Sequence, residues 1–225
     1  MPDLAGRSEW ERLFSRRLTR LERKWLEELM ELLGDPPDLT RVPEAYWTGM
    51  TNTLQAEIVP LLSEIYLAAA EAMMALVPIG VSWDLVHAGA VAWAREYGFQ
   101  LVSGITANTR SFLQRSVSRF FSEQMTIGQL RELLSQKYGP VRADLIASTE
   151  VTRAAVQGEL AIVEGILAQG IGMVSVWNTS NDEIVCPICE PLNGKRKGDG
   201  WSEPPPAHPR CRCWLSHEFA DGSQV

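Results

Sequence analysis

The sequence predicts a mainly α fold, an α+β architecture in which a helical body is followed by a small cysteine-rich β module at the C-terminus. Apolar residues recur at spacings of three and four along most of the chain before Gly170, and this period lines one face of a helix. After Gly172 the pattern changes to alternation and then to a segment rich in proline, glycine, asparagine and aspartate, which is typical of strands and loops. All four cysteines lie between Cys186 and Cys213.

The first predicted helix covers residues 8–33 and is amphipathic. Its apolar face is formed by Trp10, Phe14, Leu18, Leu21, Trp25, Leu29 and Leu32. Gly34 and the prolines after it end the helix. A second stripe with the same period is basic and consists of Arg12, Arg16, Arg20 and Arg23. A stripe of this kind is usually a solvated face, and contact with DNA or an acidic partner is the alternative.

The middle of the chain is predicted to be helical, with breaks at proline and glycine. The segments are a connector over residues 41–49 and helices over 50–77, 83–102, 109–122, 130–138 and 141–169. Pro60 either kinks the helix in which it lies or begins its main part. Ser82 caps the third helix, Thr126 starts the fifth, and Gly170 ends the last. The 109–122 helix carries Arg110, Arg115 and Arg119.

Two short strands are predicted in the C-terminal part. Residues 173–177 alternate in the manner of a strand, and residues 211–215 form the second candidate. The chain is therefore divided into a variable N-terminal helical region (1–107), a second helical part (108–170), a Cys/His β module (171–217) and a tail (218–225).

Composition and charge limit the classes of function. An apolar fraction of 45% against 22% charged residues is ordinary for a globular protein and allows a core. A net charge of −7 excludes a protein whose whole surface binds nucleic acid, although a local basic face remains compatible with it. The N-terminus has no signal-peptide pattern and no uninterrupted apolar run is long enough for a membrane span, so we expect no membrane association and a role in a cytoplasm.

The cysteine module is the most informative segment. It contains Cys186-Pro-Ile-Cys189 and, further along, His208-Pro-Arg-Cys211-Arg-Cys213. A Cys-x-x-Cys pair followed by a second pair of soft ligands at this spacing is typical of a tetrahedral structural zinc site. Five donors are present for four positions, so one is spare. A local disulfide or a set of reduced, buried thiols is the alternative.

Residues 109–215 contain an ordered series of motifs: Gly128 and Leu130, the stretch Arg142-Ala-Asp-Leu-Ile-Ala-Ser-Thr-Glu150, Ala154, Gly158, Trp177, Asp182, Cys186-Pro-Ile-Cys189, Leu192-Asn-Gly194, Pro205 and His208-Pro-Arg-Cys211-Arg-Cys213. This series resembles the Mu F-like phage head-morphogenesis family of minor capsid proteins. One departure is Ser148, where the family often has arginine. The first hundred or so residues are outside the match, and in this family that part is variable and largely helical.

The resemblance implies a protein built into the procapsid in few copies and associated with the portal vertex. Its implied roles are head assembly and DNA packaging or delivery, in the virion and, during assembly, in the host cytoplasm. The implied partners are the portal protein and the major capsid or scaffold proteins. Glu150, Trp177 and Asp182 then belong to the structural motif. From its place on a closely packed helix we expect Glu150 to receive a hydrogen bond or ion pair from the β module, with Arg142 or Arg153 as the partner within its own stretch.

Two other classes of function are open. The first is a zinc-dependent nuclease or hydrolase, which would need a general base. Asp182, Glu183, His208 and His217 do not assemble into a recognised catalytic set, so we expect no enzymatic activity. The second is a zinc-ribbon-like DNA-binding regulator, supported by basic residues in the module: Lys195, Arg196, Lys197, Arg210 and Arg212.

Weak, sequence-independent contact with double-stranded DNA is a further hypothesis. Basic residues outnumber acidic ones between Thr109 and Arg153. The candidate contacts are Arg12, Arg16, Arg20, Arg110, Arg115 and Arg119, and binding through phosphates alone predicts a steep dependence on salt.

Overall fold

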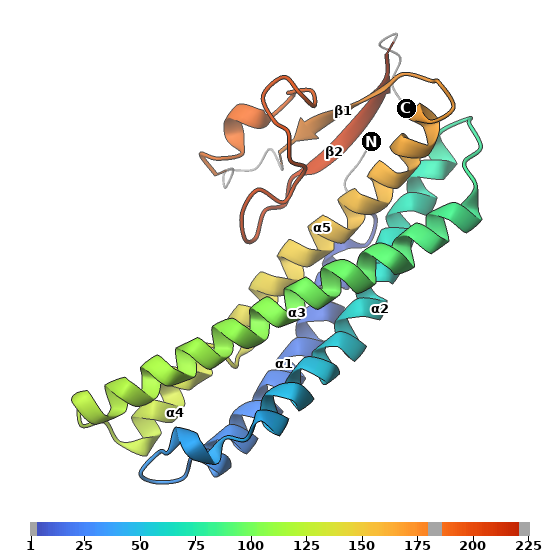
Figure 1. The fold of residues 1–225 in the computed structure, drawn as a ribbon. Coiled ribbons are helices and arrows are strands. Elements are labelled where there is room, and N and C mark those ends of the chain that lie inside the picture. The colour runs from blue at the N-terminus through green and yellow to red at the C-terminus, as the bar shows by residue number, and fades with distance from the viewer. Residues whose placement is uncertain (1–3, 180–185, 221–225) are drawn as a thin grey trace. The chain divides into compact units, whose positions relative to one another are not determined.

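The computed structural model describes residues 4–179 and 186–220. Within these residues the elements are α1 (Arg7–Leu33), the 3-10 turn η1 (Leu39–Arg41), α2 (Glu44–Leu76), α3 (Trp83–Ser122), α4 (Ile127–Ser135), α5 (Pro140–Leu167), β1 (Met173–Asn178), the 3-10 turn η2 (Glu190–Leu192) and β2 (Trp214–Phe219) (Figure 1). The predicted fold class, mainly α with a small β module near the C-terminus, is confirmed.

The ends of α1 and α5 lie close to the predicted positions because local chemistry determines them. Gly34 follows α1 with φ +70°, and Gly170 lies just beyond the end of α5 with φ +81°. Glycine adopts this left-handed conformation at no steric cost, so it ends a helix readily. Thr126 begins α4 by a reciprocal capping box with Gln129, as the sequence predicted.

The structure corrects the prediction in two other helical regions. A single 40-residue helix, α3, replaces the two helices predicted over 83–102 and 109–122. Gly104 is exposed and does not interrupt it, because one glycine costs a helix only about 1 kcal/mol. The predicted connector over residues 41–49 is also mostly helical, since α2 begins at Glu44, directly after Pro43. Pro60 lies inside α2 and does not end it.

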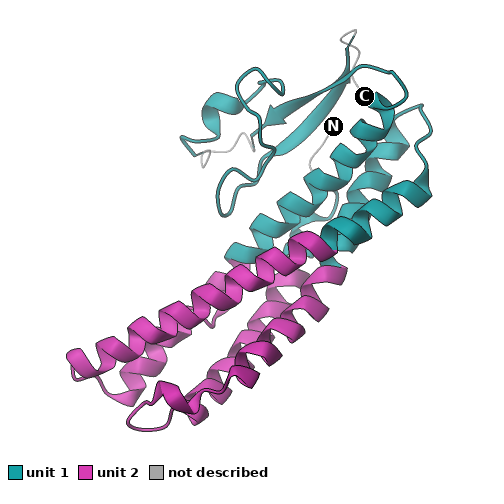
Figure 2. Ribbon diagram, in the orientation of Figure 1, with its two compact units in different colours: residues 1–11, 61–94, 145–225 teal, residues 12–60, 95–144 magenta. Residues whose placement is uncertain are grey.

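The chain forms two compact units, each built from separate stretches of sequence (Figure 2). Unit 1 comprises residues 1–11, 61–94 and 145–225, and unit 2 comprises residues 12–60 and 95–144. The cysteine module therefore belongs to the same unit as most of α5 and the second half of α2. The division into four consecutive regions, 1–107, 108–170, 171–217 and 218–225, follows chain order. It is not tested by these units and stays a prediction.

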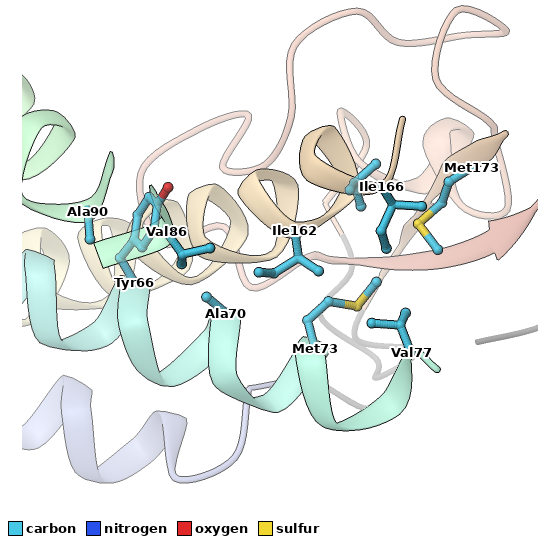
Figure 3. Packing of buried hydrophobic residues seen from close by; sticks show 10 residues of the cluster. Tyr66, Ala70, Met73, Val77, Val86, Ala90, Ile162, Ile166 and Met173 are labelled. Carbon is cyan, nitrogen blue, oxygen red and sulfur yellow. The ribbon is translucent and has the colours of Figure 1, made fainter. Parts of the chain in front are cut away.

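Unit 1 has a core formed where α2, α3 and α5 meet the start of β1. Figure 3 shows this cluster, whose buried members are Tyr66, Ala70, Met73, Val77, Val86, Ala90, Ile162, Val163, Ile166 and Met173. Gly158 lets α5 approach α2 closely, because a Cβ at this position would lie 2.9 Å from the carbonyl carbon of Tyr66. Contact between these helices therefore depends on a residue without a side chain.

Unit 2 is helical throughout its regular structure and buries the predicted apolar face of α1. Phe14, Leu18 and Leu29 are each at most 2% exposed. Beside this core lies a buried ion pair in which Arg142 Nη1 is 3.8 Å from Glu22 Oε1. Burial raises the pKa of Glu22 to about 8 although Arg142 opposes the shift, because a carboxylate is disfavoured away from water.

The sheet consists of β1 and β2, which pair antiparallel with Ser175 opposite His217 and Trp177 opposite Leu215. The first strand matches the prediction. The second does not, since β2 starts at Trp214 and continues to Phe219, within the predicted tail. Cys211 and Cys213 precede this strand, so their predicted place within it is wrong. Their loop is instead held by the contacts described below.

One helix among the described residues, α2, is long and apolar enough to cross a membrane by length and composition alone. In the structure 44% of its most apolar window is buried. Ala70 and Met73 on this helix are fully buried in the core of unit 1, so packing accounts for part of its apolar character.

Candidate metal centre

The Cys-x-x-Cys pair lies in a tight turn that directs both sulfurs to one side. The backbone N–H groups of Cys189 and Glu190 both donate to the carbonyl of Cys186 at 3.0 Å. The N–H of Cys189 also points at Cys186 Sγ, 3.4 Å away. Amide groups directed at a sulfur in this way favour its thiolate form, which is the form that binds a metal.

The second half of the predicted ligand set is folded back against this turn. His208 Nε2 lies 2.9 Å from Cys186 Sγ and 3.3 Å from Cys189 Sγ. Nδ1 of the same ring lies 2.8 Å from the carbonyl oxygen of Pro209. With the Nδ1 proton donated to that carbonyl, the lone pair is on Nε2, directed at the sulfurs.

All five predicted donors are brought together. Cys186, Cys189 and His208 form one group, and Cys189, Cys211 and Cys213 form another, with the ligand atoms of each group within 4.8 Å of one another. Cys189 belongs to both. Two sulfurs on a tetrahedral zinc lie about 3.8 Å apart, given bonds of about 2.3 Å, and the Cys189–Cys211 Sγ separation is 3.8 Å. The cluster is compatible with a bound metal ion.

The thiols differ sharply in their tendency to ionise. The hydrogen bond from the Cys213 thiol, aided by backbone hydrogen bonds and opposed by burial, lowers the pKa of Cys211 to about 5. Burial raises the pKa of Cys189 to about 12. The pKa of Cys213 is also raised, first by its hydrogen bond to Cys211 and then by burial. A cation is needed to ionise all of these sulfurs together, because neighbouring thiolates repel one another.

No disulfide forms in this arrangement. All four cysteines lie within the described residues and are free thiols. The disulfide clip, one alternative from the sequence, therefore receives no support from the structure. The other alternative, a set of reduced thiols that bind no metal, is compatible with the same geometry.

The module has a small apolar core that includes the cysteines. Trp177, which is 1% exposed, packs with Trp201 at a ring-centroid separation of 5.6 Å. The cluster also contains Val156 of α5 and Leu215 of β2. Trp177 therefore packs in the same cluster as the cysteines and Val156 of α5, and its role as part of the structural motif stays a prediction.

Two threonines on α5 hold the loop that carries Cys211, and sequence reasoning did not assign them this role. Thr149 Oγ1 accepts from the backbone N–H of Arg210 at 2.9 Å. Thr152 Oγ1 donates to the carbonyl of Cys211 at 2.9 Å and lies 2.6 Å from Arg7 Nη1. Their spacing of three on one helix face was the only signal in the sequence.

Glu150 is buried, as expected for a structural residue, and Arg153, one of the two alternative partners, contacts it. Its Oε2 lies 3.4 Å from Arg153 Nε, one helical turn away. Arg142 does not fill this role in unit 1, since its charge faces Glu22 in unit 2. Asp182, the third residue of the predicted structural motif, lies outside the described residues, as does Glu183.

A serine, a histidine and a glutamate form a second polar cluster between the sheet and α5. Ser175 Oγ lies 3.0 Å from His217 Nδ1, and His217 Nε2 lies 3.5 Å from Glu159 Oε2. A hydrolase triad has the same residue types, but there the serine pairs with Nε2 and the carboxylate with Nδ1, the reverse of this cluster, and all three side chains are buried at 3% exposure or less. A nucleophile must reach its substrate, so this cluster gives no support to hydrolase chemistry and acts here as a tie across the sheet–helix interface.

The candidate DNA-contacting arginines all lie in unit 2 and are exposed, but carboxylates face several of them. Arg20 lies 3.8 Å from Glu57, Arg110 lies 2.9 Å from Glu44, and Arg119 lies 2.9 Å from Glu123. Arg12, Arg16 and Arg115 are exposed as well. A paired arginine neutralises a phosphate less effectively, which applies to Arg20 of the basic stripe and to Arg110 and Arg119 on α3, and both interpretations of the stripe stay predictions.

Comparisons with family models, with curated proteins and with solved structures found no match to this chain. The functional argument therefore rests on the residues and their geometry.

Proposed function

We propose that the chain is a minor head protein of a phage, associated with the portal vertex and acting in procapsid assembly and in DNA packaging or delivery. In this proposal the cysteine module is held together by a structural zinc ion. The partners are the portal protein and the major capsid or scaffold proteins, with sequence-independent DNA contact as an auxiliary interaction. The role is structural and not enzymatic, in the virion after assembly in the host cytoplasm.

One observation carries the proposal. Residues of the series that resembles the Mu F-like family are spread over α5, β1 and the loops between the strands, yet they meet in one buried cluster. Thr149 bonds the loop of Cys211, and Trp177 packs in the core that contains Cys189. A chance resemblance in sequence order would not require these positions to contact one another, so their convergence supports the resemblance.

Zinc is the proposed ion because of the donor set. Three thiolates with one imidazole, or four thiolates, are soft and borderline ligands, which favour zinc over calcium or magnesium. Four of Cys186, Cys189, His208, Cys211 and Cys213 would hold the ion and leave no open position. Bound zinc would supply a cross-link between the Cys-x-x-Cys turn and the second ligand loop, in a module whose apolar core is too small to be stable alone.

The alternatives are less well supported. A DNA-binding regulator needs free positive charge on the module, but Arg196 lies 2.5 Å from Glu218 and Arg212 lies 3.8 Å from Glu11. A zinc hydrolase or nuclease needs an open metal position and an accessible base beside it. The described part of the chain offers five donors for four positions around a zinc ion, so in this proposal no metal position is left open for a substrate.

The test is the location of the protein and of its gene. We expect terminase, portal and scaffold genes beside the coding gene. We also expect the chain in purified heads, at the portal vertex in cryo-electron microscopy and in low copy number by quantitative mass spectrometry. Heads that contain no copies of the chain would overturn the head-protein proposal whether or not zinc is bound.

A further inference from the structure

The loop that carries Cys211 is connected to the N-terminus of the chain by two buried hydrogen bonds. Arg7, at the first residue of α1, is 4% exposed. Its Nη1 lies 2.6 Å from Thr152 Oγ1, and that oxygen lies 2.9 Å from the carbonyl of Cys211. All three groups belong to unit 1.

The direction of these bonds follows from the donors available. A guanidinium group is a hydrogen-bond donor and not an acceptor, so Arg7 must donate and the Thr152 oxygen must accept. The hydroxyl then has one proton of its own, which it donates to the Cys211 carbonyl, with the Ser148 carbonyl at 3.1 Å as the competing acceptor. A donated bond from a cation polarises the hydroxyl and strengthens the bond that it gives.

Two further contacts hold the loop that carries Cys211, one from α5 and one from the start of α1. The N–H of Arg210 donates to Thr149 on α5, and Arg210 has the left-handed φ of +62°, which a non-glycine residue keeps only where its surroundings impose it. Arg212 lies 3.8 Å from Glu11, one turn after Arg7 on α1. The second ligand loop is therefore fixed by α5 and by the first turns of α1.

We propose that Thr152 and Arg7 are positioning residues of the metal site. They fix the Cys211 loop before the ion binds and so raise the affinity of the module for zinc without touching the ion. Because linkage is reciprocal, bound zinc in turn holds the first turn of α1 in its docked position. The inference rests on the proposed zinc site.

The experiment compares zinc affinity in the full chain, wild type against Thr152→Val, by competition with a chromogenic chelator. Residues that support metal ligands from behind typically change metal affinity by about 10- to 100-fold, and we expect a loss in that range. Thr152→Ser keeps the hydroxyl and should restore affinity to within about threefold of wild type, below that range. Should Thr152→Val fail to fold, Arg7→Gln replaces it and should show the same loss.

The chain offers a matched control in Thr109. It is also buried on a helix, its hydroxyl bonds the carbonyl four residues earlier at 2.7 Å, and it accepts from Arg142 at 2.9 Å. It contacts no cysteine and lies in unit 2. Thr109→Val should therefore leave zinc affinity unchanged even if it lowers stability.

The reciprocal effect is measured by trypsin cleavage after Arg7, followed by mass spectrometry. Stripping zinc from the wild type should accelerate this cleavage, and Thr152→Val should be cut faster even with zinc present. A wild type that binds no zinc would remove the proposed metal site itself. A wild type that binds zinc with the affinity of Thr152→Val, or that is cut after Arg7 at the same rate with and without zinc, would overturn the positioning role alone.

Discussion

Gly158 provides the sharpest test of the packing in unit 1, through the substitution Gly158→Ala. An added Cβ would overlap the carbonyl oxygen of Tyr66 and would lie 2.9 Å from its carbonyl carbon and 3.2 Å from the Cβ of Ala69. Favourable carbon–carbon contacts lie at about 3.5–4.0 Å. The nearest obstacle is main chain, which cannot change rotamer, so α2 and α5 must separate.

Two opposing terms set the size of the effect. Alanine gains about 1 kcal/mol of helix propensity over glycine. Overpacking a core costs about 1–3 kcal/mol, and a main-chain obstacle places this case near the upper end, about 3 kcal/mol. The net loss is about 2 kcal/mol, which lowers the Tm of a domain of this size by about 4–8 °C.

The assay is thermal unfolding followed by helical circular dichroism, with Gly104→Ala as the matched control. A Cβ at Gly104 of α3 meets nothing within 4 Å, so only the propensity gain applies and Tm should rise by about 2–4 °C. If Gly158→Ala raised Tm as Gly104→Ala does, α5 would not pack against α2 at Tyr66, and the account of the unit 1 core would be refuted.

Four other predictions follow from the site and the charges. Protein purified without chelator should contain about one zinc per chain by elemental analysis. Cys189→Ser removes the sulfur common to both donor groups, so it should abolish zinc binding while most helical circular dichroism remains. Zinc retained by this variant at wild-type level would exclude this cluster as the site. Glu150→Gln should lower the free energy of unfolding by about 1–3 kcal/mol through its buried charged contact, and an unchanged urea midpoint would place its role elsewhere. Burial raises the folded-state pKa of Glu22 to about 8 from 4.5, so between these pH values the folded chain binds a proton that the unfolded chain has lost, and the free energy of unfolding should fall as pH rises through this window. Glu22→Gln should flatten that fall. An equally steep fall in the variant would show that Glu22 is not the group responsible. A gel shift with an arbitrary DNA duplex should show weak binding that is lost between about 50 and 200 mM salt, whereas binding that survives the higher salt, or prefers one sequence, would favour the regulator.

The parts of the fold that sequence predicted well are those set by neighbouring residues. The period of α1 and the glycine after it determine that helix within a few residues. The spacing of Cys186 and Cys189 likewise predicted a ligand pair, because two intervening residues close a turn whatever the surroundings. His208 was placed in the same site because it lies three residues before Cys211, a spacing that suits a turn.

The errors arose where distant contacts outweigh local preference. The sequence predicted two helices, over 83–102 and 109–122, where α3 is continuous; the single exposed glycine between them, Gly104, costs less than the long helix gains from its buried residues on both sides. The second strand was placed at Cys211 because alternation begins there, whereas hydrogen bonds from Thr149 and Thr152 hold that loop against α5. Such bonds join positions far apart in the chain, and one sequence without its fold does not reveal them.

The discontinuity of unit 1 has a practical consequence for anyone who wishes to isolate the cysteine module. A fragment that starts at residue 108 would contain every cysteine and the whole stretch that resembles the family. It would lack Tyr66, Ala70 and Met73 of α2, which belong to the same core cluster as Met173 of β1. It would also lack Arg7, which contacts Thr152, and Glu11, which contacts Arg212 in the loop that carries Cys211. We expect such a fragment to expose Ile162 and Ile166 and to aggregate. Residues 1–11 and 61–94, although outside the resemblance, are thus part of the same compact unit, and recombinant or evolutionary exchange of the C-terminal half would have to carry them along.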